Sequence, residues 1–422
     1  MDKARLAAVK TVYAVETEGA YANVALAQIL RSEKLSDLDR RFCTEIVYGT
    51  VKTGASLDWK ISKYINRAVD AKTRAVLRVG MYQIFFMDRV PNSAAVNESV
   101  EIAKKFCGIG ASKFVNGVLR SAVRNPHASD FPADDLALNT FHPAWLVELF
   151  VEEFGIDTAK KICAANNVEP PICLRVNTLK ATRAEILAEL QKIGADAQES
   201  KIAPEGIICR NLGALDKFKP LKSGACQVQD ESSMLAAHIL NPRENEFVID
   251  CCAAPGGKTT HIAELMKNRG RIIAADIFPA KIEHIRQNAS RLGIKIIEPL
   301  LIDAREIGSK FPAQADKILV DAPCSGLGVI RRKADIRWKK TPAEIAELPK
   351  LQREILQSAS HAVKTGGALV YSTCTIIRRE NEDTVENFLA ANKNFQLVET
   401  RKLLPHVDGT DGFFIAKMIR EA

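Results

Sequence analysis

Residues 247–259 read FVIDCCAAPGGKT, an apolar run that leads into a loop of small residues. The apolar part, at 247–250, has the length of a buried strand. Small residues let the backbone that follows come close to a ligand, and the next helix presents its N-terminus there. The alternation continues with helices at 258–266 and 279–292 and strands at 271–276, 295–302, 317–321 and 367–372. Continuous apolar strands between helices predict an α/β domain with a parallel sheet covered on both faces.

The N-terminal third has a different pattern, helix after helix. Leu77, Met81 and Ile84 fall on one helical face, and we find no period-two alternation nearby. A mixed segment follows, with helices expected at 143–154, 157–165 and 182–193 and a strand at 172–176. We therefore predict three domains: an all-α domain at 1–138, a small mixed α and β domain at 139–225 and the α/β domain at 226–422.

Composition narrows the class of protein. The 422 residues include 59 Lys and Arg against 51 Asp and Glu, a net charge of +8, which favours a polyanionic partner. The 10 cysteines form no Cys-x-x-Cys pair and give no zinc-ligand spacing with the 7 histidines, so we expect neither a disulfide framework nor a metal site. Free thiols suit a reducing cytoplasm, and neither a signal peptide nor a bilayer-spanning run is apparent. We expect a cytoplasmic monomer with no membrane partner.

Carboxylates stand at or near the ends of four expected strands: Asp250, Asp276, Asp303 and Asp321. Such sheets bind ligands beyond the carboxyl ends of their strands, and a carboxylate about 20 residues after the glycines, as Asp276 is, commonly takes ribose hydroxyls. A phosphate-binding loop would need a glycine where Cys252 stands, and the dinucleotide pattern G-x-G-x-x-G is absent. The pattern favours an adenosine ligand without a pyrophosphate, such as S-adenosylmethionine. The alternative is that the acids only cap turns.

Two cysteines belong to the same predicted rim, Cys324 in DAPCSG at 321–326 and Cys374 in YSTCT at 371–375. A lone free cysteine is most often a small buried apolar group, but a thiol pair beside a methyl donor suits one chemistry. C5 of a pyrimidine attacks a sulfonium methyl poorly until a thiolate has added at C6. A base then takes the C5 proton and the thiol leaves, while an acid partner near N3, for which Asp321 is placed, stabilises the adduct.

With these motifs the chain resembles the bacterial RNA cytosine-5 methyltransferases of the NOL/NOP/Sun group, and within it the RsmB (Sun, Fmu) family. The resemblance covers nearly the whole chain. Its motifs are CAAPGGK at 252–258, DAPCSG at 321–326, YSTCT at 371–375, LRVNTLK at 174–180 and DGFF at 411–414. It implies a NusB-like helical domain that binds RNA, a small α+β RNA-binding middle domain and a Rossmann-like class I methyltransferase domain.

The resemblance also implies the residues of the site. It assigns the nucleophile to Cys374 and assistance with product release to Cys324. The residues implied for S-adenosylmethionine are Cys252, Ala253, Ala254, Pro255, Gly256, Gly257, Lys258, Asp276, Lys281, Asp303 and Asp321. The implied reaction is methyl transfer to C5 of a cytosine in 16S rRNA, at position 967.

Other interpretations stay open. DNA cytosine-5 methyltransferases attack with the cysteine of a Pro-Cys motif, which would point to Cys324, whereas the second motif, at Cys374, favours RNA. Another RNA, either tRNA or a different rRNA cytosine, is a further possible substrate. A non-catalytic RNA-binding factor with a methyltransferase fold is the alternative from a different class, and intact Cys324, Cys374 and Lys258 favour the enzyme over it.

The segment 331–340 reads RRKADIRWKK, with six basic residues, one acid and a tryptophan. Basic side chains neutralise phosphates, and an aromatic ring stacks on an unpaired base. A target base must leave its stack to reach a thiol, so single-stranded RNA is the expected substrate. The pattern predicts that this segment faces RNA; the alternative is a solvated start of a helix.

Overall fold

Helices alone build the first part of the chain, as the sequence predicts. They are α1 Lys3–Thr17, α2 Ala22–Ser32, α3 Asp37–Lys52, α4 Gly54–Ser62, α5 Ala71–Phe86, α6 Asn92–Phe106, α7 Ile109–Arg124, the 3-10 turn η1 Pro126–Ser129, α8 Leu136–Thr140, α9 Ala144–Phe154 and α10 Ile156–Ala165. Side chains of Asp2, Ser36 and Asp70 accept from the first turns of α1, α3 and α5 and so fix where these helices begin. The buried faces of α1 to α7 form one apolar core.

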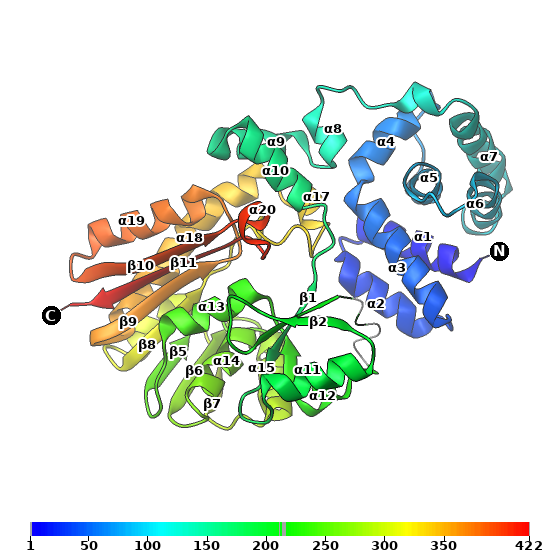
Figure 1. Cartoon of the computed structure of the whole chain (residues 1–422). Coiled ribbons are helices and arrows are strands. Elements are labelled where there is room, and N and C mark those ends of the chain that lie inside the picture. Colours follow the sequence, from blue (N-terminus) through cyan, green and yellow to red (C-terminus); the bar gives the residue numbers. More distant parts are fainter. Residues whose placement is uncertain (1, 211, 213–216, 422) are drawn as a thin grey trace. The chain divides into compact units, whose positions relative to one another are not determined.

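The chain divides into two units. One consists of Met1–Val168 with Ile330–Lys339, and the other of Glu169–Val329 with Lys340–Ala422. Figure 1 shows the computed structural model, which describes residues 2–210, 212 and 217–421. Because the segment 330–339 belongs to the first unit, the chain passes between the units three times. The bounds of the three predicted domains stay predictions. None of the helices in these residues is long and apolar enough to cross a membrane.

A small antiparallel sheet opens the second unit. Its strands are β1 Ile172–Val176, β2 Asp196–Glu199, β3 Gly206–Arg210 and β4 Cys226–Val228, in the order β2-β3-β1-β4, with the helices α11 Arg183–Lys192 and α12 Lys219–Ser223. The sequence predicts only β1 and α11. The strand β2 is too polar and too exposed to show an apolar pattern, and β4 is too short.

The large sheet has seven strands in the order β10-β11-β9-β8-β5-β6-β7. The strands are β5 Phe247–Asp250, β6 Arg271–Asp276, β7 Ile297–Leu301, β8 Ala315–Asp321, β9 Val363–Thr373, β10 Phe395–Leu403 and β11 Phe413–Arg420. Strands β5 to β9 pair in parallel, as predicted, but β11 runs antiparallel to both β9 and β10. The prediction of a wholly parallel sheet is therefore wrong at this edge, where β10 and β11 are joined by a short connection that is too short for a parallel crossover.

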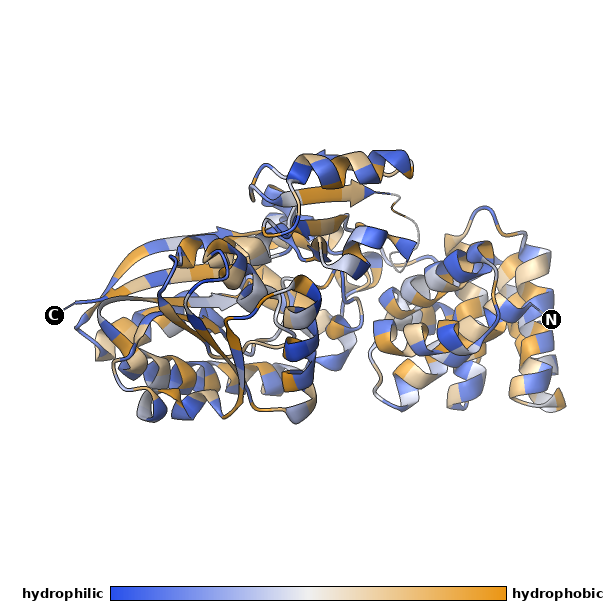
Figure 2. Cartoon of the chain, turned by 90° about the horizontal axis from the view of Figure 1, so that it is seen from below, coloured by the Kyte–Doolittle hydropathy of each residue, from blue (hydrophilic) through white to orange (hydrophobic). Residues whose placement is uncertain are grey.

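Helices cover both faces of this sheet. They are α13 Glu231–Leu240, α14 Gly257–Leu265, α15 Pro279–Leu292, α16 Ile307–Lys310, α18 Pro342–Ala362, α19 Glu382–Ala391 and α20 Pro405–Asp408, with the 3-10 turns η3 Ala304–Glu306 and η4 Arg378–Glu380. Neighbouring residues of β8 enter opposite layers, because Val320 packs with α18 and α19 while Leu319 packs with α13 and α14. Figure 2 shows hydrophilic and hydrophobic residues mixed along the helices, as expected of helices with one buried face.

Candidate active site

Hydrogen bonds with β6 and α15 hold the loop between β5 and α14. The amide of Ala253 donates to the carbonyl of Ala275 in β6 at 2.8 Å, and Asn288 of α15 donates to the carbonyl of Pro255 at 2.8 Å. Gly256 precedes α14 with φ of +100°, a conformation that favours glycine. The sequence motif thus folds into a tight turn that presents the N-terminus of α14 at the carboxyl ends of the strands.

Three of the predicted carboxylates surround this loop. Burial raises the pKa of Cys252, and the charges of Asp250, Asp321 and Asp276 raise it further. Asp276, only 6% exposed, accepts from the amide of Phe278 at 3.2 Å and lies 3.6 Å from Nζ of Lys281. The predicted pair Asp276 and Lys281 is therefore brought together at the end of β6.

Asp250 lies beneath the loop. Its Oδ2 accepts from the hydroxyl of Thr259 at 2.6 Å, while its Oδ1 has no hydrogen-bond partner in the described part of the chain. Burial raises the pKa of Asp250 to about 7. A buried carboxylate with a free oxygen under a glycine-rich loop fits a site built for a polar ligand.

Asp303 differs from the other three. It caps η3, and its carboxylate forms an ion pair with Arg305, whose Nη2 lies 2.7 Å from Oδ2. The hydrogen bonds from Arg305 lower the pKa of Asp303, although its partial burial opposes them. This carboxylate is ionised and already engaged, so a ligand would share it with Arg305.

The two predicted cysteines meet at the rim. Cys324 lies in the loop after β8 and Cys374 directly after β9, and their sulfur atoms are 3.3 Å apart. The hydrogen bond to Cys374 and burial both raise the pKa of Cys324 well above the usual range. Either sulfur can donate to the other in this contact.

A cation lies beside this pair. Nζ of Lys258, in the first turn of α14, is 2.7 Å from Oδ2 of Asp321, whose Oδ1 accepts from the hydroxyl of Ser372 at 2.9 Å. Burial alone would lower the pKa of Lys258, but the charge of Asp321 raises it, and Cys374 adds to this. Lys258 therefore stays protonated next to the sulfur of Cys374.

A buried carboxylate behind Cys324 escaped the sequence analysis. Glu380 in η4 accepts from the amide of Ser325 at 2.9 Å and from Nε2 of Gln352 at 2.8 Å; Gln352 also donates to the carbonyl of Pro323 at 3.0 Å. Burial raises the pKa of Glu380. These bonds hold the residues on both sides of Cys324. No spacing in the sequence marks Glu380, which lies in a polar run between β9 and α19.

Two glycines explain why the DGFF motif belongs to the site. The amide of Gly328 donates to the carbonyl of Cys374 at 2.9 Å, and the amide of Gly412 donates to the carbonyl of Gly328 at 2.8 Å. A β-carbon on Gly328 would lie 2.0 Å from the carbonyl oxygen of Gly412. Only glycines allow the Cys324 loop to pass this close to the start of β11.

The prediction that the segment 331–340 faces RNA is wrong for Arg337, Trp338 and Lys339. Arg337 is fully buried in the helical unit and donates to the carbonyl of Phe141 at 2.8 Å. Trp338 donates to the carbonyl of Val51 at 2.7 Å, and Lys339 to backbone carbonyls of the loop after α1. The donors expected to meet phosphates are bonded to the unit's own backbone, while Lys333 is exposed.

The sheet is mixed and has seven strands, a glycine-rich turn follows β5, and carboxylates stand at the strand ends. Together these features define a Rossmann-like class I methyltransferase. The family described as 16S rRNA methyltransferase RsmB/F matches residues 237–419, the NusB family matches 2–124, and a ferredoxin-like domain of the RsmF/B-like methyltransferases matches 142–215. The chain belongs to the RsmB/F family of rRNA methyltransferases, and its cofactor is S-adenosylmethionine.

Relatives support this membership over the whole chain. The probable ribosomal RNA small subunit methyltransferase B of Bacillus subtilis is 40% identical over 97% of each chain. The crystal structure of PH0851 superposes with a TM-score of 0.89 at 29% identity, covering 100% of this chain and 99% of that one. The structure of NSun6 from Pyrococcus horikoshii with SFG, a cofactor analogue, has a TM-score of 0.61 at 28% identity, covering 66% and 98%.

Proposed function

We propose that the chain methylates C5 of a cytosine in 16S rRNA, at position 967, through a covalent bond between Cys374 and C6. The observation that carries this proposal is the 3.3 Å separation of the two sulfur atoms, at which one thiol can donate to the other. Methylation of a ring nitrogen or a ribose hydroxyl needs no such pair of thiols. Addition of a thiolate to C6 is what turns C5 into a nucleophile.

Each thiol has a separate task in this scheme. The thiolate of Cys374 forms the S–C6 bond, C5 takes the methyl group, a base removes the C5 proton, and the S–C6 bond breaks to return the thiolate. We assign the S–H of Cys324, whose sulfur lies 3.3 Å away, to donate to that sulfur and to stabilise the charge that returns to it. Lys258, protonated and close to Cys374, favours the thiolate both before attack and after release.

The carboxylates have tasks on either side of the thiols. We assign Asp321, held by Lys258 and Ser372, to hydrogen-bond the N3 edge of the cytosine. S-adenosylmethionine, when bound, supplies the methyl group from its sulfonium. We assign its ribose hydroxyls to Asp276 and its adenine to the exposed apolar Ile277 and Phe278, which follow that carboxylate directly.

The remaining predicted residues contribute to the same pocket. We propose that the loop at Cys252, Ala253, Ala254, Pro255, Gly256 and Gly257 contacts the cofactor through its backbone, with Lys281 and Asp303 at the edge. We also propose that the enzyme works as a monomer in the cytoplasm.

Removal of the Asp276 carboxylate by Asp276→Ala should weaken cofactor binding by about tenfold or more, since a hydrogen bond to a charged group contributes about 1.5–3 kcal/mol. Unchanged affinity in calorimetry would remove Asp276 from the pocket.

The experiment that tests the thiol assignment traps the intermediate. With cofactor and 16S rRNA, Cys324→Ala should stall at release and give a protein–RNA band on a denaturing gel. Cys374→Ala should give neither this band nor methylated RNA, and the double variant serves as the control because it should also form no band. Bands from Cys374→Ala alone would reverse the two roles.

Mapping of the product distinguishes the substrates. Label transferred from the cofactor should be sensitive to RNase and resistant to DNase, and bisulfite sequencing should find it at one cytosine. Label in tRNA, or at a different rRNA cytosine, would overturn the position while leaving the chemistry intact. Full activity of both single cysteine variants would instead disprove the covalent mechanism itself.

A further inference from the structure

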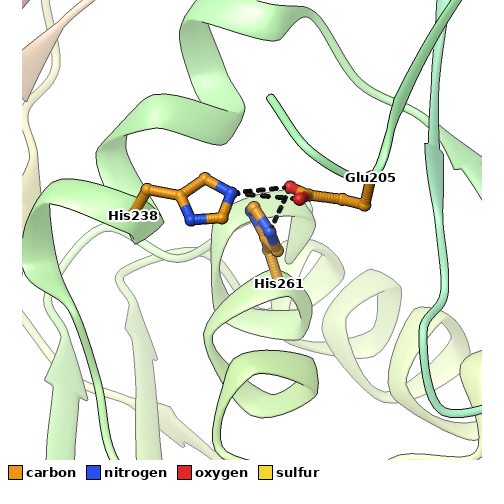
Figure 3. A group of neighbouring side chains, drawn as sticks. All are labelled: Glu205, His238 and His261. Carbon is orange, nitrogen blue, oxygen red and sulfur yellow. Dashed lines mark hydrogen bonds and ion pairs between the residues drawn. The ribbon is translucent and has the colours of Figure 1, made fainter. Parts of the chain in front are cut away.

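Three side chains with metal-binding atoms come together from α13, α14 and the residue before β3 in the small antiparallel sheet. Glu205 lies just before β3, His238 in α13 and His261 in α14, and Figure 3 shows all three pointing at one another. Nε2 of His238 is 3.0 Å from both carboxylate oxygens, and Nε2 of His261 is 2.6 Å from Oε1. One ligand atom from each residue lies within 4.8 Å of the others.

His261 is the member whose contacts are incomplete. Its side chain is 1% exposed, yet neither of its ring nitrogens has an aligned hydrogen-bond partner in the described part of the chain, since the 2.6 Å contact with Glu205 lacks hydrogen-bond geometry. Buried polar atoms without partners are rare, and each calls for an explanation. The buried imidazole of His261 is not aligned for a hydrogen bond to Glu205, and such an orientation suits an ion bound between the two side chains.

The charge of this cluster also suits a cation. Glu205, 6% exposed, brings a carboxylate against two imidazoles, and a carboxylate with two neutral imidazoles is a set of ligands that a divalent cation takes. The nearby guanidinium of Arg175 is paired with Glu264 at 2.8 Å, and that carboxylate offsets its charge.

We propose that Glu205, His238 and His261 form a binding site for a divalent cation of the zinc class. Two imidazoles and one carboxylate are a ligand set that zinc uses, with a solvent molecule as fourth ligand. Bonds of about 2.0–2.1 Å at tetrahedral angles need ligand atoms about 3.3 Å apart, so the contacts of 3.0 Å and 2.6 Å from the two imidazoles to Glu205 would each open by less than about an ångström. The side chain of His238 is 28% exposed, so an ion can reach the site from solvent.

Such an ion would link the small antiparallel sheet to α14, the helix that follows the proposed cofactor loop. Glu205 belongs to the sheet of β1 to β4, and His261 lies one turn after Lys258 in α14. Arg175 of β1 already bonds the carbonyl of Gly257 at 2.6 Å, so the sheet holds α14 at its first turn. The sequence hides this site because its three ligands come from separate elements with no motif spacing.

The competing explanation is a cluster closed by hydrogen bonds, in which Glu205 accepts from both imidazoles and needs no metal. His238→Gln separates the two, because glutamine can still donate to Glu205 but cannot replace an imidazole ligand of this reach. Because the side chain of His238 is 28% exposed, the substitution should leave the fold intact. His127→Gln is the matched control, because His127 is also 2.9 Å from a carboxylate, that of Asp130, but is exposed.

The test uses the full chain, freed of metal by a chelator and titrated with zinc and with cobalt. The native chain and His127→Gln should each bind one zinc ion that His238→Gln does not bind, or should bind this ion more than about 100-fold more tightly than His238→Gln does. The reason is that loss of a residue that only hydrogen-bonds a metal ligand already lowers the metal affinity by about 10–100-fold. The cobalt difference spectrum between native and His238→Gln should show tetrahedral visible bands without a thiolate charge-transfer band, which excludes Cys324 and Cys374. Zinc should raise the melting temperature of the native chain but not that of His238→Gln.

Two results would overturn the proposal. Equal zinc stoichiometry and equal cobalt spectra in the native chain and His238→Gln would leave a hydrogen-bonded cluster only. A thiolate band in the difference spectrum would mean that the extra ion sits on cysteines. Equal melting temperatures of both chains in chelator alone show that the variant is folded, so that either result bears on the metal and not on a damaged protein.

Discussion

Arg175 in the second unit and Arg337 in the first are both fully withdrawn from solvent, and the chain stabilises them by different means. Arg175 forms an ion pair with the buried carboxylate of Glu264. Arg337 instead donates to the carbonyls of Phe141 and Asn166 and to the side chain of Asn167, and burial lowers its pKa. One charge is neutralised, whereas the other is only solvated by dipoles. Arg175 therefore depends on a counter-charge in addition to its neutral acceptors, whereas Arg337 depends on acceptors of the folded chain alone.

The largest effect is expected at Arg175. Arg175→Met leaves the carboxylate of Glu264 buried without its counter-ion, which costs about 3–5 kcal/mol of unfolding free energy. Urea denaturation followed by circular dichroism measures this loss. The double variant Arg175→Met, Glu264→Gln should recover part of it, because no charge then remains buried. A double variant as unstable as the single one would show that Arg175 acts through its bonds to α14 rather than through charge.

Asp250 shows a third way to bury an acidic group, which is to keep its proton. Its pKa is raised from 3.8 to about 7 by burial, so the folded chain holds one more proton than the unfolded chain between these values. Stability from this group is full below about pH 4 and is lost as the pH rises through about 7. Asp250→Asn should therefore gain about 2–4 kcal/mol relative to the native chain between pH 4 and 7. A stability difference independent of pH would mean that Asp250 is ionised throughout.

Arg337→Met should cost less than Arg175→Met. Its removal leaves carbonyl and amide oxygens without donors but leaves no charge unpaired, for which about 1–3 kcal/mol is expected. The melting temperature of the helical unit measures the effect, and Arg337→Lys, which keeps the charge but loses the fork of donors, should recover little. Full recovery by lysine would show that charge, not the geometry of the donors, anchors the segment.

The smallest effect is expected at Lys333, which lies in the same segment but is exposed. Lys333→Ala should change the unfolding free energy by less than about 0.5 kcal/mol. If Lys333 contacts a phosphate, the slope of log affinity for rRNA against log salt should fall by about 0.7–0.9. An unchanged slope would leave this segment with no contact to RNA through Lys333.

Much of the fold can be predicted because buried parallel strands and well-capped helices leave clear patterns. The bounds of β1, β5, β6 and α15 agree with prediction to the residue; α15 begins at a proline and ends before Gly293. The hairpin of β10 and β11 escaped because β10 carries charged residues at exposed positions and only the four-residue helix α20 stands between the two strands.

The site could be predicted only as far as its motifs reach. Cys324, Cys374 and Lys258 stand in compact motifs, and the structure brings them together at one rim. Glu380 and the cluster around His261 come from distant elements, so no spacing connects them. Arg337 was misjudged for a different reason: a guanidinium looks the same in a sequence whether its partners are phosphates or the chain's own carbonyls.

The three passages of the chain between the units bear on how the protein is made. Residues 1–168 leave the ribosome first, yet their unit also includes the segment 330–339, so it stays incomplete through the synthesis of about two thirds of the second unit. During that time the carbonyls that will receive Arg337 and Trp338 have no donor from the segment. The N-terminal helices are therefore expected to gain their final stability late in translation, after the Cys324 loop has emerged.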